Sequence, residues 1–144
     1  MTRVTNAVDD AVQDVFVRAF GCTLTPAEGA TPPADMLAIA MPLVCDGVAG
    51  SAVLVLPRGL VALVAGRLLA GASEQSLDEA ELRDFGGEIC NMLVGRVATQ
   101  FSAAGAVLSL GTPQPALPAD AALPAQWLCA GLPLSFHLRL PGAR

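Results

Sequence analysis

Two apolar runs joined by an Asp-Gly pair constrain the fold of this chain more than any other feature. Residues 36–45 (MLAIAMPLVC) and 50–56 (GSAVLVL) have the length and composition of strands, and Asp46-Gly47 between them is a strong signal for a tight hairpin turn. Pro42 has no backbone N–H, so we expect the first strand to lie near a sheet edge or a bulge. The pattern predicts an antiparallel hairpin.

Three segments have the periodicity of amphipathic or buried helices. Apolar residues recur at helical spacing over residues 5–20, and Gly21 ends this first segment. Pro57 begins a second helix that extends to about residue 71. Ser76-Leu77-Asp78-Glu79 matches the capping box S-x-x-E, so a third helix is expected to start there and to reach about Phe101.

The remaining segments predict loops and short strands. Residues 22–34 and the proline-rich stretch 113–126 are expected to be surface loops, whereas 106–111 and two runs around Gly131-Leu132-Pro133 are expected to be strands. Hairpin-linked strands and neighbouring helices favour an α+β fold with two layers and a largely antiparallel sheet. At 144 residues, the simplest organisation is one domain over residues 1–144.

Composition excludes several classes of protein. The chain is 53% hydrophobic and 15% charged, which is unlike a disordered protein. Its net charge of −5 and the lack of a basic stripe argue against nucleic-acid binding. No apolar run is long enough to span a bilayer, and the N-terminus does not resemble a secretion signal, so we expect a cytoplasmic protein without a membrane segment.

The cysteines do not predict a metal site. Cys22, Cys45, Cys90 and Cys129 lie far apart without C-x-x-C spacing, so zinc is improbable and four reduced, mostly buried thiols are expected. His137 is the single histidine, and no acid is placed by the sequence to orient it. We therefore interpret His137 as structural rather than as a general base.

The third predicted helix carries a row of polar side chains on one face. At about 100° per residue, Asp84, Glu88 and Asn91 point to one side, and Phe85 and Ile89 point to the other. These residues could simply solvate the exposed side of an amphipathic helix. A metal site or an acid/base pair is less well supported, because no histidine or third ligand accompanies the carboxylates.

Three glycines lie close to this row, although glycine is unfavourable within a helix. Each glycine costs about 1 kcal/mol in a helix relative to alanine, yet Gly86, Gly87 and Gly95 all fall within this segment. Gly86 faces the core, where it would allow close helix packing. Gly87 and Gly95 lie beside the carboxylates, where we expect a bare patch that the backbone of a partner can approach.

The segment from Gly87 to Gly95 (GEICNMLVG) resembles the G-E-x-x-N-x-(I/L)-x-G motif of the CheX/CheC family of chemotaxis phosphatases. The family signature begins with Asp or Ser. Glu follows after three intervening residues and Asn after two more, and a proline lies further along the chain. Asp84, Glu88, Asn91 and Pro113 match it. Residues 50–56 and 134–138 also resemble family strands, and the single motif is closer to CheX than to CheC.

This resemblance implies a function and a set of roles. The family acts on the phosphorylated aspartate of a CheY-type response regulator, which supplies the catalytic Mg²⁺, so the phosphatase needs no cofactor of its own. By the family analogy, Asn91 positions the attacking water and Glu88 binds the regulator's lysine. Asp84, Gly87, Gly95 and Pro113 would belong to the partner-binding surface, and a homodimer is an open expectation.

Two other functions remain alternatives. Where the family usually has Gly-Asn-Ala after the motif, this chain has Gly95-Arg96-Val97, and Arg96 falls outside the row. A non-catalytic module of the same fold that binds a response regulator or another signalling partner is therefore the second hypothesis. A metal hydrolase that uses the same carboxylates is the third, and it lacks ligands.

Overall fold

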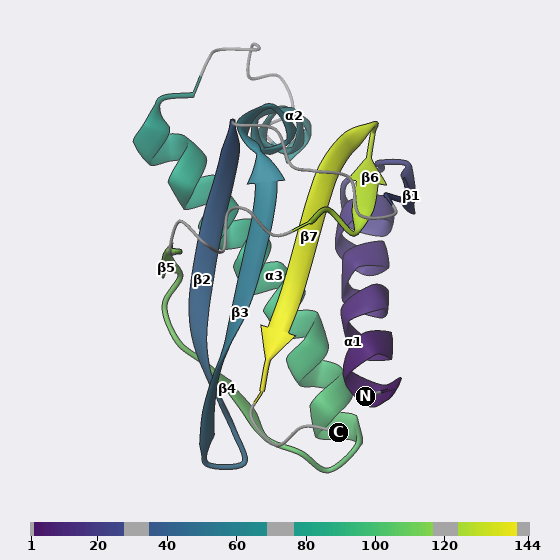
Figure 1. Ribbon diagram of the computed structural model, residues 1–144, viewed down its shortest axis with the longest axis vertical. Coiled ribbons are helices and arrows are strands. Elements are labelled where there is room, and N and C mark those ends of the chain that lie inside the picture. Colours follow the sequence, from purple (N-terminus) through teal and green to yellow (C-terminus); the bar gives the residue numbers. More distant parts are fainter. Residues whose placement is uncertain (1, 28–34, 69–76, 117–123, 141–144) are drawn as a thin grey trace.

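A sheet packed against helices forms the body of the protein in the computed structural model, which describes residues 2–27, 35–68, 77–116 and 124–140 (Figure 1). The helices are α1 (Thr2–Val12), which continues as a π-helix (Gln13–Ala19), α2 (Arg58–Leu68) and α3 (Glu79–Ala103). The strands are β1 (Leu24–Pro26), β2 (Met36–Cys45), β3 (Val48–Pro57), β4 (Leu108–Leu110), β5 (Gln114–Pro115), β6 (Trp127–Cys129) and β7 (Leu132–Arg139).

The sheet is antiparallel in every pairing that the described residues make. Its strand order is β1-β6-β7-β3-β2-β4, and β5 also pairs with β2. Helices α1 and α3 pack against one face, and α2 lies at one end of β3 (Figure 1). The expected two-layer α+β fold with a largely antiparallel sheet is confirmed.

The predicted hairpin of β2 and β3 is the centre of this sheet. Asp46 and Gly47 have φ values of 49° and 84°, so both turn residues adopt the left-handed conformation that a two-residue hairpin loop requires. The two strands pair from Met36↔Pro57 to Cys45↔Val48 without interruption. The Asp46 carboxylate also accepts a hydrogen bond from Val107 N at 2.9 Å, which ties the turn to the residue before β4.

Alternating residues of β2 face the helices and make the core. Leu37, Ile39, Met41 and Leu43 are each at most 3% exposed. Their neighbours on the same face of the sheet include Leu54 and Leu56 of β3 and Phe136 of β7, and from α3 the core receives Ile89, Leu93 and Val97. The helix layer therefore covers a continuous apolar face.

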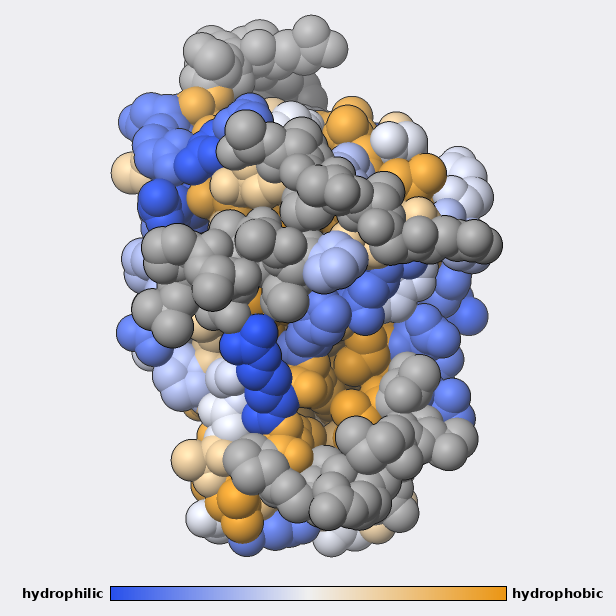
Figure 2. All heavy atoms as spheres, viewed as in Figure 1, coloured by the Kyte–Doolittle hydropathy of each residue, from blue (hydrophilic) through white to orange (hydrophobic). Residues whose placement is uncertain are grey.

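The opposite face of the sheet is also apolar at its centre. Val53 and Val55 point away from the helices, because Leu54 and Leu56 point toward them, yet both valines are buried. Figure 2 shows this face, with hydrophobic side chains between hydrophilic ones. Ser135 and His137 of β7 lie on this face too, where Ser135 is buried and His137 is half-buried.

Two short strands were not expected from the sequence. β1 lies within the predicted loop 22–34 and pairs with β6, and β5 lies within the proline-rich stretch 113–126 and pairs with β2. Strands of two or three residues have no periodicity to detect, and pairing with a longer neighbour forms them. Within these two predicted loops, residues 28–34 and 117–123 lie outside the described residues.

Helix α3 begins two residues later than the expected capping box. Its N-cap is Asp78, whose carboxylate accepts a hydrogen bond from Glu81 N at 2.8 Å, and Glu81 Oε1 accepts one from Asp78 N at 3.0 Å. The sequence contains two overlapping capping patterns, and the one from Asp78 to Glu81 forms. Ser76 lies outside the described residues.

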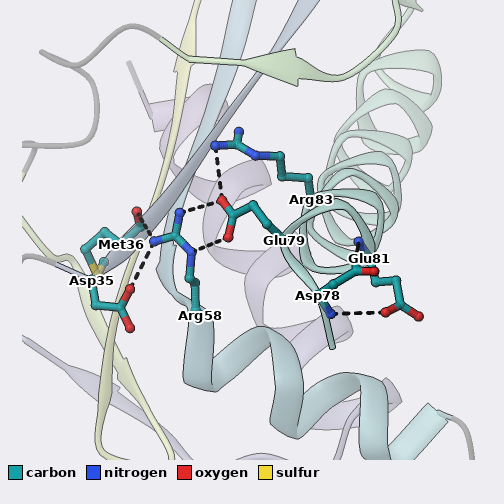
Figure 3. A network of polar contacts seen from close by, with 7 residues as sticks. All are labelled: Asp35, Met36, Arg58, Asp78, Glu79, Glu81 and Arg83. Atoms are coloured by element: carbon teal, nitrogen blue, oxygen red, sulfur yellow. Dashed lines mark hydrogen bonds and ion pairs between the residues drawn. The ribbon is translucent and has the colours of Figure 1, made fainter. Parts of the chain in front are cut away.

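The later start leaves Glu79 available to Arg58, which connects three segments of the chain (Figure 3). Arg58 Nε and Nη2 donate to the two carboxylate oxygens of Glu79 at 2.9 and 2.7 Å, and Nη1 donates to Asp35 Oδ1 at 3.0 Å and Met36 O at 3.2 Å. A two-bond arginine–carboxylate pair restrains orientation as well as distance. Arg58 therefore joins the first residues of β2, α2 and α3.

We expect Arg58→Gln to lower the thermal unfolding midpoint, with an effect that depends on pH. The hydrogen bond from Arg58 holds the pKa of Glu79 below its ordinary value. The stability that this interaction contributes is complete above the pKa of the carboxyl group in the unfolded chain, and it is lost as the pH falls through the lowered folded pKa. The difference between wild type and variant should therefore shrink in acid, as measured by circular dichroism between about pH 7 and pH 3.

Arg18→Gln is the matched control. Arg18 pairs with Asp14 one turn away in the same helix, and its side chain is 76% exposed, so its removal should change the midpoint little. An Arg58→Gln effect no larger than that of Arg18→Gln, or one that does not change with pH, would contradict the stated role of Arg58.

Candidate functional site

Helix α3 presents the predicted polar row to solvent. Asp84 and Glu88 are exposed and Asn91 is half-buried. Within the described ranges, none of these three side chains makes a hydrogen bond or an ion pair. Two carboxylates and one amide are therefore arranged along successive turns of one helix and are available to bind a partner.

Gly86 brings α3 close to β2. A Cβ atom at this position would lie 2.2 Å from Ile39 Cδ1 and 2.9 Å from Leu37 Cδ2, closer than side chains pack. The expected reason for Gly86, close packing of the helix on the core, is confirmed. This contact sets the depth and rotation of α3, so that the polar row points away from the sheet.

Gly87 is covered by the chain itself rather than left open. A Cβ atom on Gly87 would lie 3.3 Å from Pro113 Cβ, so the proline ring rests on the helix at this residue. The expectation of a bare patch at Gly87 is therefore wrong, because a segment distant in sequence packs there. The structure does bring Pro113 beside the row, since Gly87 precedes Glu88 directly.

Pro113 is held in this position by a segment along the edge of β2, which we call the edge segment (residues 108–115). β4 pairs with β2 through Leu43↔Leu110, and β5 pairs with it through Ile39↔Pro115. Between them, Gly111 N donates to Pro42 O at 2.7 Å. Pro42 thus sits where the regular pairing of β2 with its edge neighbours is interrupted, as its missing N–H predicted.

Gly95 and Arg96 continue the exposed surface of α3. A Cβ atom on Gly95 would have no neighbour within 4 Å, so the bare patch expected there is confirmed. Arg96 is exposed and makes no hydrogen bond or ion pair in the part of the chain that the structure describes. Arg96 therefore contributes no polar contact to the packing of α3 within that part of the chain.

The other reactive side chains lie elsewhere. His137 pairs with Val53 on the sheet face turned away from the helices, so it is separated from the row by the sheet. Cys90, next to Asn91, is turned into the core, and burial raises the pKa of its thiol to about 12. No group of three metal-binding side chains occurs within the described ranges.

One apolar residue near the row was not identified from the sequence. Leu110 of β4 is 39% exposed, although its pairing partner Leu43 is 1% exposed. A strand was expected over residues 106–111, but the sequence gave no indication that it would lie at an exposed edge beside α3. No helix in the described ranges is long and apolar enough to cross a membrane.

The fold and the site define a class of two-layer α+β proteins in which a long helix carries an acid-and-amide row beside the sheet edge. The sequence model of the family described as "Chemotaxis phosphatase CheX" matches residues 38–133 of this chain. The chain therefore belongs to the CheX family. No curated protein matches it closely enough in sequence to count as a relative.

Solved structures of CheX and CheC-like proteins share this fold. A CheC-like superfamily protein from Shewanella sp. PV-4 is 18% identical and has a TM-score of 0.73, with 99% of each chain covered. CheX from Vibrio vulnificus is 23% identical with a TM-score of 0.63, covering 77% of this chain and 72% of the other. A CheX-CheY-BeF3-Mg²⁺ complex from Borrelia burgdorferi is 13% identical with a TM-score of 0.62, covering 96% of each chain.

The two helix glycines give a direct test of the packing of α3. We expect Gly86→Ala to lower the free energy of unfolding by about 1 kcal/mol or more, because Ile39 and Leu37 must move within a packed core. Gly95→Ala should raise it by up to about 1 kcal/mol, since the new methyl group meets open space and alanine favours the helix. Urea unfolding of both variants measures the difference.

The expected result is that Gly86→Ala lowers the free energy of unfolding and Gly95→Ala raises it. If Gly86→Ala were as stable as Gly95→Ala, α3 would not be held at this depth, and the orientation of the polar row would need another explanation.

Proposed function

We propose that this protein is a phosphatase that hydrolyses the phospho-aspartate of a CheY-type receiver domain. The observation that carries the proposal is the row of Asp84, Glu88 and Asn91 on α3, which has no internal partner in the described ranges and matches the family signature. Membership of the CheX family supports it. A CheX from Borrelia burgdorferi in complex with CheY supports the choice of partner.

Asn91 is the group that we assign to the chemistry. An amide can accept a hydrogen bond from water through its oxygen and donate another through its nitrogen, so it fixes the orientation of water without changing its own charge. The water oxygen attacks phosphorus in line, the bond between phosphorus and the aspartyl oxygen breaks, and inorganic phosphate and a free carboxylate result. The contribution of Asn91 is the position of the nucleophile.

Glu88 and Asp84 are assigned to binding. Glu88 lies one helical turn from Asn91 and makes no ion pair with any residue that the structure describes, so it can accept a charge-assisted hydrogen bond from the receiver's lysine. Asp84, one turn further, would contact the rim of the receiver. The two carboxylates also repel a free phosphate anion close to α3. This repulsion favours a substrate whose phosphoryl group is attached to a protein.

The receiver domain would bring the Mg²⁺ that this reaction needs. The Borrelia burgdorferi complex contains Mg²⁺ together with CheY and BeF3. We therefore assign no metal to Glu88 or Asp84, and the proposed substrate implies a cytoplasmic location. A homodimer remains an expectation that sedimentation of the free protein would test.

The second candidate is a non-catalytic module that binds the receiver without hydrolysing its phosphate. Arg96 favours this candidate, because it departs from the usual family residue and adds an exposed positive charge one residue after Gly95. The two candidates share a binding surface and differ in turnover.

We expect Asn91→Ala to reduce stimulated dephosphorylation by about 100-fold or more while the affinity for the receiver stays close to that of wild type. Glu88→Ala should lower both the rate and the affinity. Release of inorganic phosphate from a phosphorylated receiver measures the first quantity, and titration with a BeF3-loaded receiver measures the second.

Gln100→Ala is the matched control, because Gln100 is another amide on α3, where it donates to Asp10 of α1. It should leave the rate unchanged. Wild-type phosphatase rates in Asn91→Ala would show that Asn91 does not position the nucleophile.

A further inference from the structure

The edge segment holds a large apolar side chain in solvent on the helix side of the sheet. Leu110 pairs with Leu43, whose side chain faces the helix layer, so Leu110 points to that same side. β4 also packs against α3. An apolar side chain that is 39% exposed therefore lies at the flank of the helix that carries the polar row.

The edge segment is held firmly just after Leu110. Gly111 lies so close to β2 that a Cβ atom there would be 2.9 Å from Pro42 O, and its N–H donates to that oxygen at 2.7 Å. Two residues further on, Pro113 rests on Gly87 of α3. Leu110 is thus presented on preorganised backbone, which reduces the ordering cost of a contact made there.

We infer that Leu110 and Pro113 form an apolar wall of the docking surface and that the occupant is the receiver domain. This inference rests on the proposed function. The wall is continuous with the polar row, because Pro113 contacts the residue before Glu88. The row brings negative charge that no cation among the described residues pairs with, and this charge complements the receiver's lysine.

The surface combines the two kinds of contact that a protein interface needs. Asp84 and Glu88 supply charge that steers and orients the partner, and Leu110 supplies apolar area that is removed from water on binding. At Gly95 the bare helix leaves space for the partner to approach. Leu110 therefore contributes to affinity for the receiver together with the carboxylates, and Asn91 determines the rate of the chemical step.

Leu110→Ser and Val44→Ser form the test pair. Val44 is 42% exposed and pairs with Ser109, the neighbour of Leu110, but it points to the opposite face of the sheet. We expect Leu110→Ser to raise the Kd for a BeF3-loaded receiver and the KM for the phosphorylated receiver about tenfold, with kcat unchanged. Val44→Ser should leave all three constants at their wild-type values.

A measurement on the wild-type protein complements the variants. The methyl NMR signals of Leu110 should shift when the BeF3-loaded receiver is added, and those of Val44 should not. An unchanged Kd in folded Leu110→Ser, equal losses in both variants, or unshifted Leu110 signals at saturation would overturn the inference. If the wild-type protein binds the receiver and shows these effects but releases no phosphate, the docking surface stands and the phosphatase function fails.

Discussion

Gly86 has no side chain, and Ile39 and Leu37 of β2 reach into the space that a Cβ atom would occupy. The rest of the site depends on this contact. It brings α3 close to the central hairpin, directs Ile89 and Leu93 into the core, and turns Asp84, Glu88 and Asn91 away from it. A bulkier residue would force Ile39 and Leu37 to move within the packed core.

Two further interactions hold the ends of this arrangement. Arg58 joins Glu79 at the start of α3 to Asp35 and Met36 at the start of β2, so the helix and the strand begin from a common point (Figure 3). At the other side, the edge segment passes from β2 to α3 and places Pro113 on Gly87. The polar row is therefore carried by rigid elements rather than by a flexible loop, as a positioned nucleophile requires.

Much of the fold was predictable because local chemistry and tertiary packing agree. Asp46-Gly47 accepts the left-handed conformations of the hairpin turn, and the strands on either side pair as their apolar pattern indicates. Helix α3 starts later than predicted because two capping boxes overlap in the sequence and the second one forms. The ion pair of Glu79 with Arg58 joins residues far apart in the sequence, so no local pattern encodes it.

The site was predictable in part for the same reasons. Helical spacing places Asp84, Glu88 and Asn91 on one face wherever the helix lies, and the structure agrees. The contact of Gly87 with Pro113 and the exposure of Leu110 depend instead on where the edge segment pairs with β2. A short strand contains too few residues to predict that pairing from its own sequence.

Substoichiometric turnover shows whether this surface performs catalysis as well as binding. A small amount of wild-type protein is mixed with an excess of phosphorylated receiver, and inorganic phosphate is followed over time. We expect many equivalents of phosphate per molecule of protein, released well above the receiver's own rate of hydrolysis. Release at the receiver's intrinsic rate, or slower, with tight binding would contradict this expectation and identify a binding module instead.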